Sequence, residues 1–191
     1  MLEANLNRKL RYISKTIVNC MKLMRSDAYL MKLILSKKNE PLKDETITPQ
    51  YVKDRLTQTG VGEKTYNDIL APFPFNETAK VEEETNVRVY SSANYFIENG
   101  AWLESTISFD VLTPKSQWLI KLKEEGSESS ISVIRPYEIV ARIVNIFNQS
   151  ESIDGVYKLK FDGFSHISIG TGYEGIRVYA KVHSLEAKSE G

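Results

Sequence analysis

Six residues near the end of the chain, Gly170-Thr171-Gly172-Tyr173-Glu174-Gly175, match the G-x-G-x-x-G pattern of dinucleotide-binding loops. In those proteins the last glycine opens a helix, and the N-terminus of that helix holds the pyrophosphate. Here the residues that follow, 176–183, alternate between apolar and polar as a strand does. We therefore interpret the six residues as a glycine-rich β-turn rather than a nucleotide site.

A second glycine-rich segment, Gly60-Val61-Gly62-Glu63-Lys64-Thr65, resembles the end of a phosphate-binding P-loop. That loop requires a glycine directly before the lysine and another glycine five positions earlier. This sequence has Glu63 and Gln58 at those positions, and Glu63 would place a negative charge beside a phosphate. The segment does not predict nucleotide binding.

The remaining residue types with catalytic potential are scattered. His166 and His183 are the two histidines, and neither has the spacing that places metal ligands on one face. The acidic run Glu82–Glu84 is typical of a solvated surface, and no G-x-S-x-G nucleophile element is present. We expect no catalytic, cofactor-binding or metal-binding residues, and therefore no hydrolase, transferase or nucleotide-binding activity.

The composition of the 191 residues is that of a folded protein without a strong charge bias. Hydrophobic residues make up 41%, and 25 basic residues balance 25 acidic ones. The single cysteine, Cys20, cannot form an internal disulfide and lies in an apolar helical stripe, so we expect a buried thiol in a reducing compartment. No stretch is apolar for long enough to predict a membrane span.

The first part of the chain predicts helices. Apolar residues recur every three or four positions from Leu6 to Ala28, which is the pattern of an amphipathic helix. Ser26-Asp27 is expected to cap a second helix that runs through Ser36 and is ended by Pro41. Thr48-Pro49 predicts the start of a short helix near 49–58. We therefore assign residues 1–70 to a helical N-terminal region and 71–85 to an extended linker.

The second part of the chain, residues 86–184, predicts strands and one long helix. Strands are expected at 86–91, 101–113, 156–161, 164–169 and 176–183, with an Asn99-Gly100 turn and an Asp162-Gly163 turn. A wide apolar face predicts an amphipathic helix at 135–149, against which Ile107, Phe109 and Val111 should pack. The fold class is thus α+β, with a mostly antiparallel sheet on one long helix and a flexible tail at 185–191.

Two features of the sequence suggest a known family. One is this order of elements, and the other is the pattern x-h-x-h-D/E-h-h-x-P in the long strand, where h is a hydrophobic residue. The matching residues are Ile107, Phe109, Asp110, Val111, Leu112 and Pro114. The pattern resembles the tail-terminator and neck-completion (head-tail joining) proteins of tailed bacteriophages. The resemblance implies a non-enzymatic virion protein that forms a ring, commonly a hexamer, which completes the tail and joins it to the neck.

Aromatic residues around the predicted hairpin are candidates for the contacts between subunits. They are Tyr95, Phe96, Trp102 and, beyond Pro114, Trp118. Aromatic side chains are frequent anchors of protein interfaces, although the same rings can instead fill the core of their own subunit. The resemblance further implies that the partners are other copies of the chain, the tail tube protein and head-completion or connector proteins. It implies no membrane partner and no sequence-specific nucleic acid, although DNA can pass through the ring. It also implies that the protein is located in the virion and, during assembly, in the host cytoplasm.

An alternative function is suggested by the charge of the N-terminal helices. Residues 1–43 carry ten Lys or Arg against Glu3, Asp27 and Glu40. Such a surface can bind nucleic acid or an acidic partner, and it can also be an ordinary solvated face.

Overall fold

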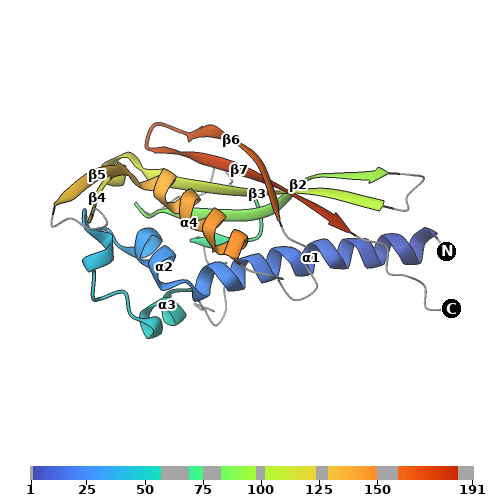
Figure 1. The fold of residues 1–191 in the computed structure, drawn as a ribbon, viewed down its shortest axis with the longest axis horizontal. Helices are drawn as coiled ribbons and strands as arrows, with labels where there is room; N and C mark the ends of the chain where they lie inside the picture. The colour runs from blue at the N-terminus through green and yellow to red at the C-terminus, as the bar shows by residue number, and fades with distance from the viewer. Residues whose placement is uncertain are drawn as a thin grey trace.

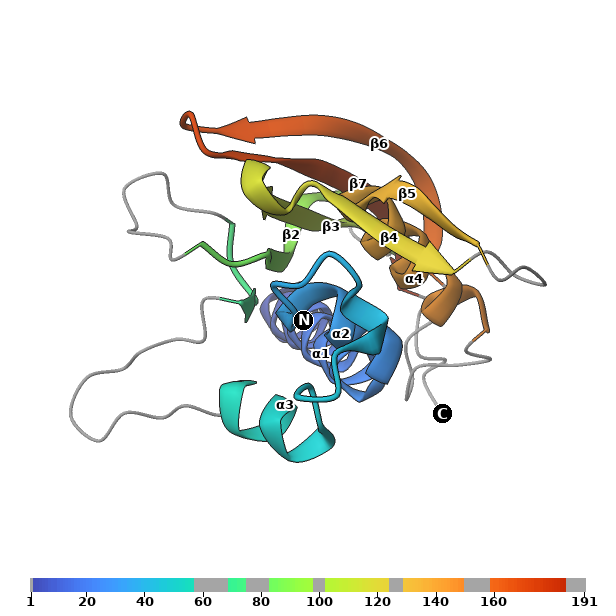
Figure 2. The same ribbon diagram turned by 90° about the vertical axis from the view of Figure 1, so that its left-hand side faces the viewer.

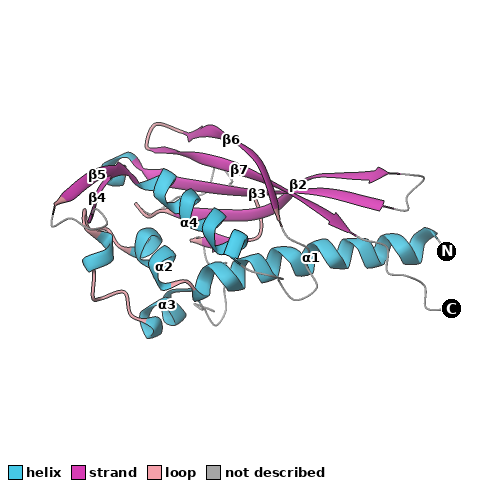
Figure 3. Ribbon diagram, viewed as in Figure 1, coloured by secondary structure: helices cyan, strands magenta, loops and turns pink. Residues whose placement is uncertain are grey.

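The computed structural model describes residues 2–56, 69–74, 83–97, 102–123, 129–149 and 159–184. It has the expected α+β fold, with helices first and a mostly antiparallel sheet after them (Figures 1 and 3). Residues 1, 57–68, 75–82, 98–101, 124–128, 150–158 and 185–191 lie outside the described residues. They include the P-loop-like segment, the Asn99-Gly100 turn and the C-terminal tail.

The helical region begins with a long helix and continues with short ones. The elements are α1 Leu2–Ser26, α2 Ala28–Leu35, the 3-10 helix η1 Pro41–Lys43, and α3 Pro49–Leu56. The two predicted caps are confirmed, because Asp27 Oδ1 accepts from Leu30 N at 2.7 Å and Thr48 Oγ1 accepts from Tyr51 N at 3.1 Å. Pro41 starts η1, and α2 ends well before it at Leu35.

The main sheet has the order β1-β2-β3-β7-β6 within the described residues. Its strands are β1 Leu70–Ala71, β2 Asn86–Ile97, β3 Trp102–Pro114, β6 Lys160–Ile169 and β7 Tyr173–Ser184. Neighbouring strands are antiparallel except for β1, which runs parallel to β2. The boundary predicted between residues 70 and 71 falls inside β1, whose two residues are buried.

The β6–β7 hairpin corrects one sequence-based expectation and confirms another. Asp162-Gly163 was expected to separate two strands, but β6 is continuous and absorbs these residues as an irregularity between Phe161 and Gly163. The glycine-rich turn is confirmed, because residues 170–172 connect β6 to β7 and Gly170 has a φ of 59°. This positive φ favours glycine because side chains with a Cβ rarely adopt it. No helix follows the turn, so the G-x-G-x-x-G match has no dinucleotide-binding geometry.

A second, two-stranded sheet has no counterpart among the strands expected from the sequence. After the 3-10 helix η2 (Lys115–Gln117), β4 (Leu119–Lys123) pairs antiparallel with β5 (Ser130–Ile134). The chain then passes directly into the predicted helix, α4 (Arg135–Gln149). The small sheet therefore holds the start of α4 in place.

The core lies between the main sheet and two helices that cover one of its faces. α1 contacts β2 and β3, while α4 contacts β3 and β7, so the two helices lie side by side under the sheet (Figure 2). The predicted sheet–helix contact is confirmed: Ile107, Phe109, Val111, Ile139, Ile143 and Phe147 are all buried. Residues of α1 and α2, including Cys20, belong to the same hydrophobic cluster. The helical region and the sheet thus share one core.

Candidate functional site

Large apolar side chains are exposed where the β6 edge of the sheet meets the small sheet. Phe164 of β6 is 65% exposed, Leu119 of β4 is 59% exposed and Tyr137 of α4 is 46% exposed. Ile134 of β5 is paired with Leu119 across the small sheet and is 36% exposed. Together with the half-buried Trp118 and the exposed His166, these residues form what we call the edge patch.

Two ring contacts join three segments of the chain in the edge patch, namely β6, α4 and the residue before β4. The rings of Tyr137 and Phe164 meet edge to face with centroids 6.4 Å apart, and Trp118 and His166 do the same at 6.4 Å. Edge-to-face geometry is the favoured arrangement of aromatic pairs. The rings of the edge patch thus contact one another across parts of the chain that are far apart in the sequence.

Strand register explains why Phe164 and His166 lie on the same side as α4. Phe164 is paired with Val178 and His166 with Ile176, and both β7 residues are buried on the helix-covered face. Because alternate side chains of a strand share a face, Phe164 and His166 point to that side as well. β6 is the edge strand, so these two side chains reach past the cover that the helices provide.

Buried Arg135 fixes the start of α4 and therefore the position of Tyr137. Its guanidinium donates to the backbone carbonyls of Ser36 at 2.5 Å and Lys38 at 2.9 Å, which lie just beyond the end of α2. Its backbone N–H donates to the carbonyl of Trp118 at 2.8 Å. Burial lowers the pKa of Arg135 to about 10, which still leaves it charged at neutral pH.

A polar rim borders the edge patch at its β7 side. Glu174 pairs with His166 at 3.1 Å and with Lys115 at 3.1 Å. Lys121, on the outer face of β4, is exposed as well. An apolar centre within a polar rim is the usual anatomy of a protein–protein interface.

The predicted interface residues fall into two places. Trp118 joins the edge patch and lies beyond the C-terminal end of β3. Trp102 is at the other end of β3, where the strand begins, and is paired with Ile97 of β2. Tyr95 and Phe96 lie beside Trp102 in β2, in the part of the β2–β3 hairpin farthest from the small sheet (Figure 1). The side chains of Tyr95, Phe96 and Trp102 lie outside what the structure describes. The structure therefore separates Trp118 from the other three aromatic residues.

The opposite face of the sheet carries a closed polar network. Arg177 donates to both carboxylate oxygens of Asp110 at 2.6 and 2.7 Å, and the Tyr90 hydroxyl donates to Asp110 at 3.0 Å. The Asp110 hydrogen bond holds the pKa of Arg177 above its usual range, and burial raises the pKa of Tyr90 to about 12. Asp110 is only 1% exposed, and its carboxylate is bound by Arg177 and Tyr90. The carboxylate therefore has a structural role and is poorly placed for acid–base chemistry.

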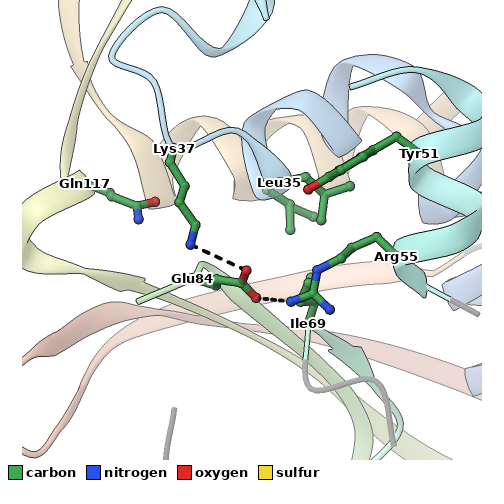
Figure 4. A pocket seen from close by; sticks show the side chains of 8 residues that line it. Leu35, Lys37, Tyr51, Arg55, Ile69, Glu84 and Gln117 are labelled. Atoms are coloured by element: carbon green, nitrogen blue, oxygen red, sulfur yellow. Dashed lines mark hydrogen bonds and ion pairs between the residues drawn. The ribbon is translucent and has the colours of Figure 1, made fainter. Parts of the chain in front are cut away.

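The pocket beside α3 is also closed by its own residues. Glu84 at the entry to β2 pairs with Arg55 at 2.5 Å and Lys37 at 3.6 Å (Figure 4). The pocket has about 10 Å³ of space, which is room for about one water molecule. Small-molecule sites are far larger, so this feature links α3 to the sheet rather than binding a ligand.

Three further features of the described part of the chain concern its cysteine, its potential metal ligands and its helices. Cys20 is fully buried, and burial raises the pKa of its thiol to about 12, which opposes thiolate chemistry. No group of three or more His, Cys, Asp or Glu residues there could hold a metal ion. None of the described helices is both long enough and apolar enough to cross a membrane.

The model of the YomW family matches residues 27–182. The chain belongs to the YomW family. The YomW match runs from Asp27, the cap of α2, to Val182 in β7, so it includes both sheets, α4 and the whole edge patch but omits α1. No curated protein matches the chain.

Proposed function

We propose that this chain is a structural protein of a phage-type particle, which assembles into a ring at the head–tail interface and completes the tail or joins it to the neck. The edge patch is the observation that carries the proposal. Monomeric proteins rarely leave a contiguous aromatic patch open to water, and such patches mark surfaces that a partner covers. The YomW family is phage-derived, which supports a role in a phage particle.

The geometry of the sheet supports assembly into a ring rather than a simple dimer. A ring requires two different surfaces on each subunit, one for each neighbour. The edge patch lies at one end of the sheet, and the β2–β3 hairpin extends from the opposite end (Figure 1). We assign the first contact to the edge patch and the second to the hairpin that carries Tyr95, Phe96 and Trp102.

The partners proposed for the ring are further copies of the chain, the tail tube protein and the head-completion or connector proteins. Self-association is the part that the purified protein can test. We expect multi-angle light scattering to give a multimer for the wild type and negative-stain images to show closed rings. A wild type that stays monomeric at high concentration, with tail tube protein present, would contradict the proposal.

Phe164→Asp tests the assigned contact. Truncation of an anchor residue costs about 2 kcal/mol or more of binding, which is roughly a 30-fold loss of affinity at each contact. Because Phe164 is 65% exposed, the variant should keep the circular dichroism spectrum and melting temperature of the wild type. Leu10→Asp is a matched control, since Leu10 is 51% exposed but lies on α1, away from the edge patch. Equal dissociation of both variants would show that added charge, rather than the edge patch, controls assembly.

A further inference from the structure

One solvent-facing side of α1 carries a row of cations. Arg11, Lys15 and Lys22 are all exposed. With 3.6 residues per turn they fall within about 40° of one another around the helix, and a rise of 1.5 Å per residue spreads them over about 16 Å. We call these three residues the basic row.

The basic row differs from those cations of the described residues that form ion pairs with acidic side chains. Arg142 pairs with Asp27 at 2.6 Å, and Lys38 pairs with Asp44 at 2.8 Å. Within the described residues, no ion pair involves the basic row. The single acidic residue in the α1 sequence is Glu3, more than one turn away from Arg11. The row therefore presents an uncompensated positive charge.

The residues around the basic row favour phosphate groups over a protein partner. Protein interfaces are enriched in aromatic anchors and depleted in lysine. Here the neighbours Asn7 and Ser14 are exposed and polar, and such side chains donate hydrogen bonds to phosphates. Val18 is the exposed apolar residue within the row, and it is too small to act as an anchor.

We propose that the basic row of α1 binds the phosphate backbone of double-stranded DNA without reading its sequence. This surface and this partner are separate from the edge patch and from the contacts assigned to ring closure. In the proposed ring, α1 would face the DNA that passes through. The DNA contact itself needs only α1 on a folded chain.

The test measures DNA affinity over a salt series with the full chain. Fluorescence anisotropy of a labelled duplex of arbitrary sequence gives the slope of log affinity against log salt concentration. The variant replaces Arg11, Lys15 and Lys22 by Gln, which keeps helix propensity. The control replaces Lys37, Lys43 and Lys53 by Gln, because these residues are exposed around α2, η1 and α3, lie outside the edge patch and remove the same charge.

Each lost phosphate contact should reduce the magnitude of the slope by about 0.9, so the α1 variant should lose about 2.7. Between 50 and 200 mM salt, the wild-type affinity should therefore fall roughly 40-fold further than that of the variant. The control should keep the wild-type slope. Poly-glutamate at equal charge should compete poorly with DNA, and light scattering should show the same oligomeric state for all three proteins.

Four results would overturn the inference. The first is no measurable DNA binding by the wild type, and the second is an equal change of slope in the variant and its control. The third is competition by poly-glutamate that is as strong as competition by DNA. The fourth is a changed oligomeric state in the α1 variant. The last would make α1 a contact between subunits. Failure of the ring would appear instead as a monomeric wild type, with its DNA affinity measured independently.

Discussion

Removal of one ring from the sheet–helix contact should be among the most damaging single changes in this protein. Phe109 of β3 and Phe147 of α4 are at most 1% exposed, and their ring centroids are 5.5 Å apart. Phe161 of β6 completes the cluster at 6.1 Å from Phe109 and 6.3 Å from Phe147. Phe109→Ala or Phe147→Ala removes buried apolar surface and leaves a cavity, so each should lower the free energy of unfolding by about 3–5 kcal/mol.

A double-mutant cycle can separate the interaction energy between the two rings from the cost of the cavities that the substitutions leave. An aromatic pair contributes about 0.5–1.5 kcal/mol beyond its buried area. The double variant, Phe109→Ala with Phe147→Ala, should therefore cost less than the sum of the single variants by about that amount. If the double variant does not fold, Phe109→Leu and Phe147→Leu provide a milder cycle.

Denaturation by urea, followed by circular dichroism, measures these changes. All variants must be compared at one low protein concentration, because self-association stabilises the folded state by mass action. Phe164→Ala is the control, since a ring that is 65% exposed should contribute no more than about 0.5 kcal/mol. A loss below about 1 kcal/mol at both Phe109 and Phe147 would refute the assignment of this contact as the core.

Two further predictions concern the polar groups that hold the helices. Arg135→Met should lower the free energy of unfolding by about 3 kcal/mol, because the buried carbonyl of Ser36 and the partly buried carbonyl of Lys38 lose their donor. An unchanged urea midpoint would contradict this role. Lys38 and the hydroxyls beside it hold the pKa of Asp44 well below its usual range. This stabilisation is complete above the unfolded pKa of about 4 and is lost as the pH falls toward the folded pKa. The free energy of unfolding of Asp44→Asn should therefore depend less on pH than that of the wild type below about pH 4.

The helical caps were predictable because their chemistry is local. Asp27 and Thr48 each bond to a backbone N–H three residues later, and the sequence alone contains both partners. The β6 strand was harder for the opposite reason. Asp162-Gly163 is a good turn in isolation, but β7 pairs with both halves of β6 and converts the turn into a bulge. Tertiary pairing overrode the local preference.

The small sheet has a recognisable signal in the sequence. Residues 119–123 and 130–134 both contain alternating apolar positions, and the polar segment between them is typical of a hairpin loop. The edge patch left almost no signal, since its residues come from β4, β5, α4 and β6. Trp118 was predicted as an interface residue from its side-chain type, whereas the grouping with Tyr137 and Phe164 depends on tertiary contacts.

The contrast between the two faces of the sheet shows where the protomer depends on other molecules. On the polar face, Asp110 is satisfied by Arg177 and Tyr90 within the chain. At the β6 edge, the described part of the chain leaves the outer side of the strand unpaired and exposes Phe164 beside it. An open edge strand with an exposed ring favours association with other chains, and natural proteins usually block such an edge with charge, proline or a covering segment. Evolution would be expected to remove this hazard unless a partner covers the edge, and we therefore expect the partner to be the next copy in the proposed ring.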